Sequence, residues 1–329
     1  MRKRIPVYIL VIVFMMIFFV KGVENKWTDS AIWDDFHEHY RIYSLPLPDT
    51  LSFAGEPVPV KRMPVYERLD KEMLINVYWQ SSGIMKIKRA HQFFPIIEPI
   101  LKQNGIPADF KYLAVAESNL EHVRSRAGAA GIWQLMKQPA KDYGLIVDGQ
   151  IDQRYDIQLA TQAACRYLNE AKQRFGSWTM AAAAYNRGMQ GLDKAVTDQG
   201  ETDYYRLFLN PETSRYLYRI LATKIILENP TKYGFHVRPQ DMYQWPEFRK
   251  VKVDTAVTSW PHFARQFQLS YGELRFYNPF IRDYAWDNKL GKTIYINIPL
   301  NLERRKIVTK TDTLQPKLRN PLSLQQLNH

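Results

Sequence analysis

The chain has 329 residues, of which 46% are hydrophobic and 24% are charged, a composition typical of a globular protein and not of a disordered one. Its formal net charge of +12 is typical either of a protein with an anionic partner, such as nucleic acid, a membrane surface or an acidic glycan, or of a solubility feature spread over the surface. No run of lysine and arginine exceeds three residues and no nucleic-acid-binding motif occurs, so we expect no nucleic-acid partner. The single cysteine, Cys165, excludes an intrachain disulfide and is expected to pack in the core.

Residues 1–22 are typical of an export signal. Arg2-Lys3-Arg4 precedes an uncharged apolar run from Ile5 to Val20, and the positive-inside rule leaves the rest of the chain outside the cytoplasm. This run is shorter than the roughly 20 residues that a membrane span needs. No small-residue cleavage site follows it, so the segment is predicted to be an uncleaved signal anchor, with a cleaved signal peptide as the alternative.

Residues 23–64 are rich in proline, which disfavours helices and central strands. They are predicted to form an extended linker or an arm that wraps a domain. Four aromatic residues in this region could pack on a domain or lie at a membrane interface: Trp27, Trp33, Phe36 and Tyr40.

The apolar spacing from residue 65 to residue 235 predicts an all-α domain. A first helix is expected around 69–77, a second over 84–94 that breaks at Pro95, and a short third over 96–101. Further helices are expected around 109–119, 139–143, 156–175, 177–186 and 211–228. No histidine or cysteine pair has metal-ligand spacing, so neither a metal nor another cofactor is expected.

Glu117 is the exceptional residue of the helix predicted over 109–119. Phe110, Leu113, Ala114 and Glu117 have the i, i+3, i+4, i+7 spacing of one helical face, so a carboxyl joins an apolar stripe. Burial and the negative end of the helix dipole would both raise its pKa, which suits a general acid near neutral pH. The alternative is a buried structural glutamate held by an ion pair or by backbone donors.

Three motifs in fixed order carry a resemblance to a known family. They are Glu117-Ser118, then the G-A-x-G-x-W-Q-x-M run over 128–136, and then Ala184-Tyr185-Asn186 before Gly188. Together they resemble the lytic murein transglycosylases with a goose-lysozyme-like catalytic domain, most closely the membrane-bound type D group. The resemblance covers roughly residues 65–230. Arg187 departs from it, because the family usually has a small residue there.

The resemblance implies a cleavage of the β-1,4 bond between N-acetylmuramic acid and N-acetylglucosamine in peptidoglycan glycan strands, with formation of 1,6-anhydromuramyl ends. It implies that Glu117 acts first as acid and then as base, without a metal or cofactor, in a protein of the periplasmic face of the cell envelope. It also implies that Ser118 orients Glu117 or contacts the sugar. The other substrate-binding residues that it implies are Gln134, Met136, Tyr185, Asn186 and Tyr216.

Two rival functions remain open at the level of sequence. A hydrolytic muramidase of the goose-lysozyme kind would need a second carboxylate, for which Glu121 is the best candidate. A non-catalytic murein-binding scaffold would instead depend on the C-terminal segment. We expect a monomer, attached to the membrane through its N-terminal segment or exported.

In the C-terminal segment the spacing of apolar residues changes from a helical period to the alternation typical of strands. Alternating residues over 250–253 and 293–298 predict two strands, and the residues between them predict short helices. This βααβ order, with an L-S-x-x-E-L-x-x-x-N-P run over 269–279, resembles a LysM glycan-binding module over 248–300. Trp260-Pro261 lies inside the expected first helix and Asp254-Thr255 replaces the usual turn, so a structural cap is the alternative to a glycan-binding module. Residues 301–329 are polar and are predicted to be a disordered tail.

Overall fold

The computed structural model describes residues 30, 34, 38 and 42–303. The chain divides into two compact units, residues 1–46 and 47–329, and the second carries every element described below. The predicted signal segment, the four aromatic residues that follow it and residues 304–329 of the predicted tail lie outside the described residues. Within the described part of the chain, no helix has both the length and the apolar composition needed to cross a membrane.

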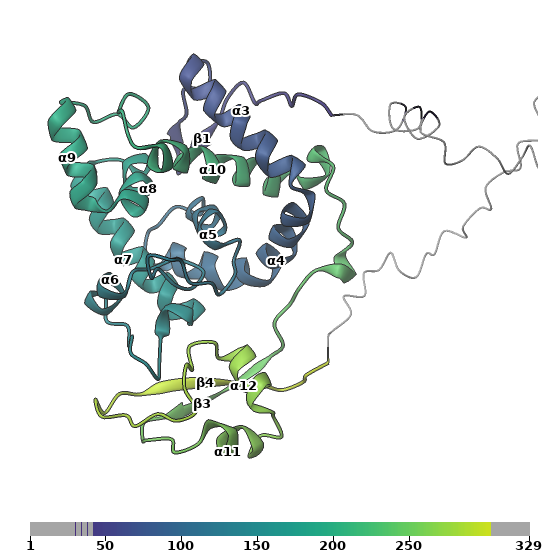
Figure 1. The fold of residues 1–329 in the computed structure, drawn as a ribbon, viewed down its shortest axis with the longest axis vertical. Helices are drawn as coiled ribbons and strands as arrows, with labels where there is room; N and C mark the ends of the chain where they lie inside the picture. Colours follow the sequence, from purple (N-terminus) through teal and green to yellow (C-terminus); the bar gives the residue numbers. More distant parts are fainter. Residues whose placement is uncertain (1–29, 31–33, 35–37, 39–41, 304–329) are drawn as a thin grey trace, which may run out of the picture. The chain divides into compact units, whose positions relative to one another are not determined.

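A set of packed helices, the helical part, forms the larger portion of the second unit (Figure 1). The short helix α5 (Phe110–Ser118) lies in the middle of this set, and α4 (Gln80–Gln103) and α10 (Pro211–Glu228) pack against it. The surrounding helices are α3 (Met63–Tyr78), α6 (Lys137–Asp142), α7 (Ile157–Phe175), α8 (Trp178–Arg187) and α9 (Met189–Gln199), with 3-10 turns η1 (Gln153–Tyr155), η2 (Pro230–Tyr233) and η3 (Pro239–Asp241). The predicted mainly helical, lysozyme-like fold is confirmed.

Side-chain caps set the ends of the helices that carry the site. The Asp156 carboxylate accepts a hydrogen bond from the backbone of Leu159 and begins α7, and Gly176, with φ 79°, ends it. Ser177 caps α8 and Asn210 caps α10 in the same way. The bounds predicted for these three helices are therefore confirmed, because local chemistry determines them.

The predicted break at Pro95 is wrong. Helix α4 runs through both Pro95 and Pro99. A proline inside a helix costs about 3 kcal/mol through the hydrogen bond that it removes and its clash with the preceding turn. Phe93, Ile97 and Leu101 lie on the same buried face of α4, and their burial on both sides of the prolines offsets this cost. No helix was predicted where the structure has α9, so α9 is a further difference from the expected elements.

Residues 47–62 form an arm that packs on the helices, as the second of the two alternatives has it, whereas Met63 and Pro64 already belong to α3. The arm contains a hairpin of β1 (Ser52–Phe53) and β2 (Glu56–Pro57) that the proline content did not predict. Ala54 and Gly55 both have positive φ, 53° and 81°, as a tight two-residue hairpin turn requires. The Asp109 carboxylate accepts hydrogen bonds from the Ala54 backbone and from Lys224, which fastens the turn to the helices.

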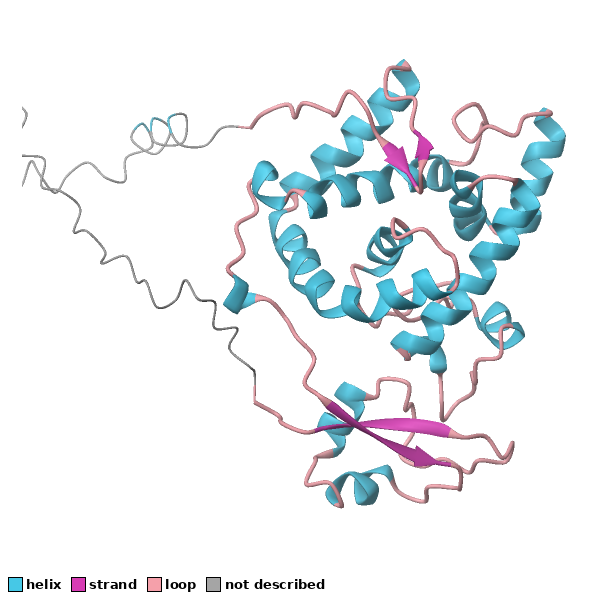
Figure 2. Cartoon of the chain, turned by 180° about the vertical axis from the view of Figure 1, so that it is seen from behind, coloured by secondary structure: helices cyan, strands magenta, loops and turns pink. Residues whose placement is uncertain are grey.

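The C-terminal part, residues 248–299, has the predicted βααβ order (Figure 2). Strands β3 (Phe248–Val253) and β4 (Ile294–Pro299) pair antiparallel, from Phe248 opposite Pro299 to Val253 opposite Ile294. Trp260 and Pro261 begin α11 (Trp260–Arg265), where proline is well tolerated, and Ser259 caps it, so the unusual dipeptide is compatible with the module. A capping box of Ser270 and Glu273 begins α12 (Tyr271–Tyr277).

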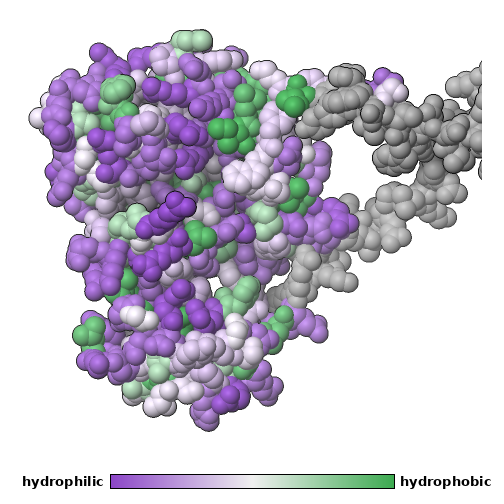
Figure 3. Space-filling view, viewed as in Figure 1, coloured by the Kyte–Doolittle hydropathy of each residue, from purple (hydrophilic) through white to green (hydrophobic). Residues whose placement is uncertain are grey.

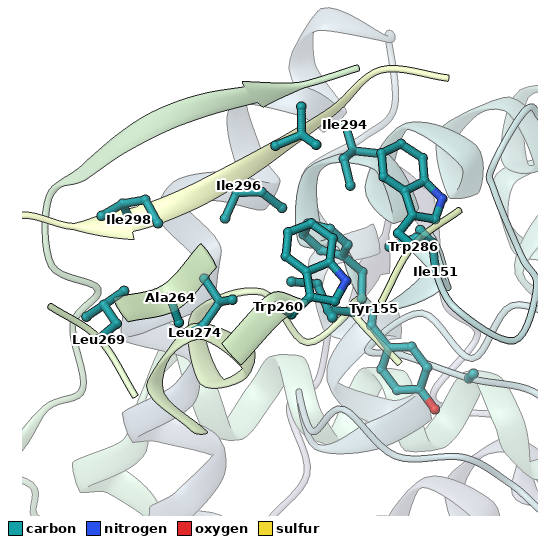
Figure 4. Packing of buried hydrophobic residues seen from close by; sticks show 14 residues of the cluster. Ile151, Tyr155, Trp260, Ala264, Leu269, Leu274, Trp286, Ile294, Ile296 and Ile298 are labelled. Carbon is teal, nitrogen blue, oxygen red and sulfur yellow. The ribbon is translucent and has the colours of Figure 1, made fainter. Parts of the chain in front are cut away.

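One face of the β3–β4 sheet forms the core of this part. Ile294, Ile296 and Ile298 are buried and lie on the side of the sheet that faces α11 and α12 (Figure 4). Ala130, Ile151 and Tyr155 of the helical part belong to the same buried cluster. Backbone hydrogen bonds extend the contact, with Asp152 N donating to Phe280 O at 2.9 Å and Arg282 N to Gln150 O at 2.8 Å. The C-terminal part is therefore joined to the helical part by a continuous apolar core.

The outer surface differs from this core in character. On the face shown in Figure 3, hydrophilic side chains predominate and hydrophobic ones are scattered among them. This face of the molecule is therefore a mainly polar surface.

The arm also stabilises the start of α8. The Glu56 carboxylate accepts hydrogen bonds from the backbone N–H groups of Trp178 and Thr179 at 2.6 and 2.8 Å, and from the Thr179 hydroxyl at 2.7 Å. Partial burial raises the pKa of Glu56, but the hydrogen bonds from Thr179 and Trp178 and the charge of Lys172 outweigh it, and the net pKa is lowered. The stabilisation is thus present above the ordinary glutamate pKa and is lost as the pH falls through the lowered one.

We predict that Glu56→Ala lowers the free energy of unfolding by about 1–2 kcal/mol, because helix-terminal N–H groups lose their acceptor. Urea unfolding at neutral pH would measure the loss. Glu67→Ala, which removes an exposed glutamate of α3, is the control and should change stability by less than about 0.5 kcal/mol. Equal stability of the Glu56→Ala variant and the parent would contradict this role of the arm.

Candidate active site

Glu117 lies in the last turn of α5, at the end of the buried face of that helix. Phe110, Leu113 and Ala114 of this face are fully buried, and Glu117 is half-buried. The helix ends here because Asn119 and Leu120 both have positive φ, 53° and 57°, which turns the chain out of the helical path. The predicted stripe and the predicted helix end are both confirmed, and they bring a carboxyl to the terminus of a buried helix.

The surroundings of Glu117 favour its neutral form. Burial raises the pKa of the carboxyl to about 7, although a hydrogen bond from Tyr216 and the charge of Arg219 act in the opposite direction. The carboxylate of Glu212 adds a smaller upward contribution. Near neutral pH both protonation states of Glu117 are therefore populated, as a group that must give and take a proton requires.

Tyr216 is the direct partner of Glu117. It lies in α10, is buried, and its hydroxyl donates a hydrogen bond to Glu117 Oε1. Burial and the neighbouring Glu117 charge keep the pKa of the Tyr216 phenol well above its usual value, so the hydroxyl stays a donor. Arg219 follows three residues later in α10, and this i, i+3 spacing could have indicated from the sequence that it acts at the same site.

Tyr185 and Asn186 lie in the last turn of α8, near this pair, and each is hydrogen-bonded to a neighbouring element. The Tyr185 hydroxyl donates to the carbonyl oxygen of Trp133 at 2.7 Å, so it positions the loop after α5. The Asn186 side-chain oxygen accepts a hydrogen bond from the Thr213 hydroxyl at 2.8 Å. The Asn186 amide NH2 group has no partner among the described residues and stays available on a half-buried side chain.

Ser118 connects the end of α5 to the loop over 128–136 by a hydrogen bond. It is buried, and its hydroxyl donates to the carbonyl oxygen of Ile132 at 2.8 Å and to that of Ala114 at 3.2 Å. The structure thus favours the orienting role over the direct sugar contact, because the hydroxyl already joins the end of α5 to the loop over 128–136. Trp133 in that loop is fully buried and donates its indole N–H to Thr161, which makes it a core residue.

Gln134 and Met136 occupy the far end of the same loop. Gln134 has φ 48°, and its amide donates to the carbonyl oxygens of Gly131 and Val123 at 2.8 and 3.1 Å, so it stabilises the turn. Met136 is 45% exposed, a high value for a large apolar side chain. Of the two, Met136 is the one whose side chain is free to contact a ligand.

Arg154 is a residue that sequence analysis missed. Its guanidinium is buried, pairs with Asp152 at 2.7 Å, and donates to the carbonyl oxygens of Gly128 and Leu135. Asp152, the partner in this buried ion pair, also caps η1, because its side chain accepts a hydrogen bond from the backbone N–H of Arg154. Arg154 therefore fixes both ends of the loop, although no spacing in the sequence connects it with the motif.

Glu121, the candidate for a second carboxylate, is engaged elsewhere. Its Oε1 lies 2.6 Å from the Arg89 guanidinium, and its side chain is 43% exposed. The same arginine donates to the carbonyl oxygen of Asn119, so the pair fastens the residues that follow α5. Among the described residues, the site contains one half-buried carboxyl with a raised pKa, that of Glu117. The carboxylate of Glu121 is instead ion-paired with Arg89.

Comparisons with known proteins match two parts of the chain. Residues 94–208 match the family described as the transglycosylase SLT domain, and residues 249–302 match the soluble lytic transglycosylase C-terminal LysM-like domain. The chain is 33% identical over 229 residues to the membrane-bound lytic murein transglycosylase D of Escherichia coli strain K12, and equally to that of strain O6:H1. That alignment covers 67% of this chain and 49% of the relative, so the chain spans about half the length of these curated relatives.

A third relative matches a shorter stretch of the chain. A putative tributyltin chloride resistance protein of Alteromonas sp. strain M-1 is 27% identical over 127 residues, which cover 38% of this chain and 61% of that protein.

We predict that Tyr216→Phe raises the pKa of Glu117 above about 7, because it removes the hydrogen bond that stabilises the ionised carboxylate. Carbon-detected NMR titration of the labelled carboxyl would measure this without any need for turnover. Tyr218→Phe, a buried tyrosine of the same helix that is not bonded to Glu117, is the control. A Glu117 pKa that is unchanged or lowered in Tyr216→Phe would show that this hydrogen bond does not set it.

Proposed function

We propose that the chain is a peptidoglycan lytic transglycosylase with Glu117 as its catalytic residue, because residues 94–208 match the transglycosylase SLT domain and residues 249–302 match the LysM-like domain. Its reaction would be cleavage of the β-1,4 bond between N-acetylmuramic acid and N-acetylglucosamine, with formation of 1,6-anhydromuramyl ends. The observation that carries this proposal is the half-buried Glu117 carboxyl, whose pKa is raised to about 7 and whose Oε1 accepts a hydrogen bond from Tyr216.

The reaction uses the same carboxyl twice. Protonated Glu117 donates its proton to the glycosidic oxygen as the bond from that oxygen to muramyl C1 breaks, which releases the 4-hydroxyl of N-acetylglucosamine. The resulting carboxylate then takes the proton of the muramyl 6-hydroxyl as O6 bonds to C1. Glu117 ends protonated, no water is consumed, and the Tyr216 hydrogen bond stabilises the carboxylate between the two steps.

A single carboxyl suffices for this reaction, and its neighbours support that interpretation. Hydrolysis by a pair of carboxyl groups needs a second one with a free oxygen facing the sugar. Glu121 is paired with Arg89, and Glu212 is paired with Arg219 at 2.7 Å. Each ion pair engages one oxygen of its glutamate, and in this proposal the internal 6-hydroxyl of the substrate takes the place of the external nucleophile that a hydrolytic muramidase would require.

The remaining site residues divide into those that hold the loops and those that contact the substrate. Asn186 keeps a free amide NH2 group, suited to an acetamido or hydroxyl oxygen, and exposed Met136 supplies an apolar contact for a sugar face. Ser118, Gln134 and Tyr185 have hydrogen bonds within the protein, so in this proposal they position the loop and Glu117.

The cellular setting of the proposal follows from its substrate. Murein lies outside the cytoplasm, so the protein would act on the periplasmic face of the cell envelope, with residues 1–22 as anchor or export signal. Within the chain we propose a catalytic domain over 65–235, which the arm over 47–62 completes, and a LysM-like module over 248–300 that binds the same glycan strands. The protein would act as a monomer.

We predict that the full-length chain releases fragments with 1,6-anhydromuramyl ends from purified cell wall. Glu117→Gln should lower the release at least about 100-fold, because it removes the proton donor. Mass spectrometry of the sugar products would test this, with Glu121→Gln as the matched carboxylate control, expected to retain activity. Reducing ends, heavier by one water, would indicate a hydrolase instead, and wall binding without release by any variant would indicate a scaffold.

We also predict that the rate of release falls as the pH rises through about 7. Glu117 must be protonated to begin the reaction, and its raised pKa keeps it protonated below that pH. Initial rates over a pH series on one cell-wall preparation would locate the fall. In Tyr216→Phe the fall should move to higher pH, whereas a rate that rises through pH 7 would mean that ionised Glu117 starts the reaction.

A further inference from the structure

A second site lies away from Glu117, in a cleft between the helical part and the C-terminal part. The cleft has a volume of about 440 Å³. One wall is α7, which presents Gln158, Gln162 and Arg166 at intervals of four residues, so the three side chains form one exposed stripe. Strands β3 and β4 supply the opposite wall.

The strand wall is the face of the sheet that the core does not use. Side chains alternate along each strand, so Phe248 and Lys250 of β3 share a face with Tyr295 and Asn297 of β4. Their neighbours Val253, Ile294 and Ile296 point to the buried core on the other side. Lys250 reaches across the cleft and donates to Gln158 Oε1 at 2.7 Å.

The cleft is rich in cations. Its charged lining residues are Arg166, Lys250, Lys292 and Asp156, so three cations accompany one carboxylate. The Asp156 carboxylate is occupied in capping α7. A ligand of this cleft should therefore carry carboxylate groups, and the amides of Gln158, Gln162 and Asn297 add donors and acceptors suited to peptide groups.

Polar groups without partners lie in the same walls. Both ring nitrogens of His122 and the indole nitrogen of Trp245 are buried and have no hydrogen-bond partner among the described residues. Such groups are rare in folded proteins, and here both belong to residues that line the cleft. Burial lowers the pKa of His122 to about 4, so near neutral pH its ring offers one donor and one acceptor, as a peptide unit does.

We propose that this cleft binds the acidic peptide stem of a murein strand while the sugar chain occupies the site at Glu117. The peptide stem brings several carboxylates and a chain of peptide groups to the three cations, whereas a glycan strand without stems offers only the lactyl carboxylate of each muramyl residue. This inference rests on the proposed function for the identity of the polymer. The shared helix α7 lines the cleft with one stripe and, through Thr161 and Trp133, supports the loop beside Glu117 with another.

The test is a calorimetric titration of the full-length chain with the N-acetylated stem peptide L-Ala-γ-D-Glu-meso-diaminopimelate-D-Ala. Lys250→Gln should weaken its binding about tenfold, the loss of one charge-assisted hydrogen bond. Lys252→Gln is the matched control, because Lys252 lies two residues along the same exposed strand, pairs with Asp254 and does not line the cleft. It should bind as the parent does, and a stem peptide with amidated carboxyls should bind the parent about tenfold more weakly.

Other outcomes would overturn the proposal. These are absence of stem-peptide binding to the parent, equal affinities of the parent and Lys250→Gln, and displacement of the peptide by a neutral chito-oligosaccharide. Binding is measured without turnover, so it separates the two ideas. Anhydro products without stem-peptide binding would overturn this inference alone, whereas stem-peptide binding by a chain that forms no anhydro products would overturn the proposed activity alone.

Discussion

The hydrogen bond between the Tyr216 hydroxyl and the Glu117 carboxyl is the interaction on which the candidate site depends. It joins α10 to the end of α5, two helices that are 99 positions apart at these residues. Burial alone favours the neutral carboxyl, and this bond opposes burial enough to leave the pKa at about 7. The packing of α10 against α3, α5 and α8 therefore matters for the chemistry of the site, because it holds the Tyr216 hydroxyl where it can donate to the Glu117 carboxylate.

Structural residues around the site connect it with distant parts of the fold. Glu56 of the arm caps α8, which ends in Tyr185 and Asn186, and Arg154 fixes the loop that contains Trp133. The C-terminal part shares its apolar core with Ala130, which lies in that loop, and with Tyr155, which follows Arg154 in η1. A change in the arm or in the C-terminal part can thus reach the carboxyl through packed elements.

Local signals in the sequence predicted much of the fold and the identity of the central residue. Caps and glycines determine the ends of α7, α8 and α10, and the apolar stripe of α5 already contains Glu117. Prediction failed where distant packing decides, as at Pro95, where burial of the flanking side chains overrides the local cost. The resemblance implied Tyr216 as a substrate-binding residue, but its hydrogen bond to Glu117 could not be predicted from the sequence. The same holds for the hydrogen bonds from Arg154 to Gly128 and Leu135, because these contacts join segments with no shared periodicity.

The two glycines of the loop over 128–136 differ in what they tolerate. A Cβ atom at Gly131 would lie 1.9 Å from the carbonyl oxygen of Arg154, whereas one at Gly128 would meet nothing within 4 Å. Both have positive φ, 77° and 91°, but only Gly131 is also excluded by volume. For a designer who wishes to diversify this loop, Gly128 is accessible to residues that adopt a left-handed backbone, such as asparagine. Variation at Gly131 would require rebuilding the Arg154 segment at the same time.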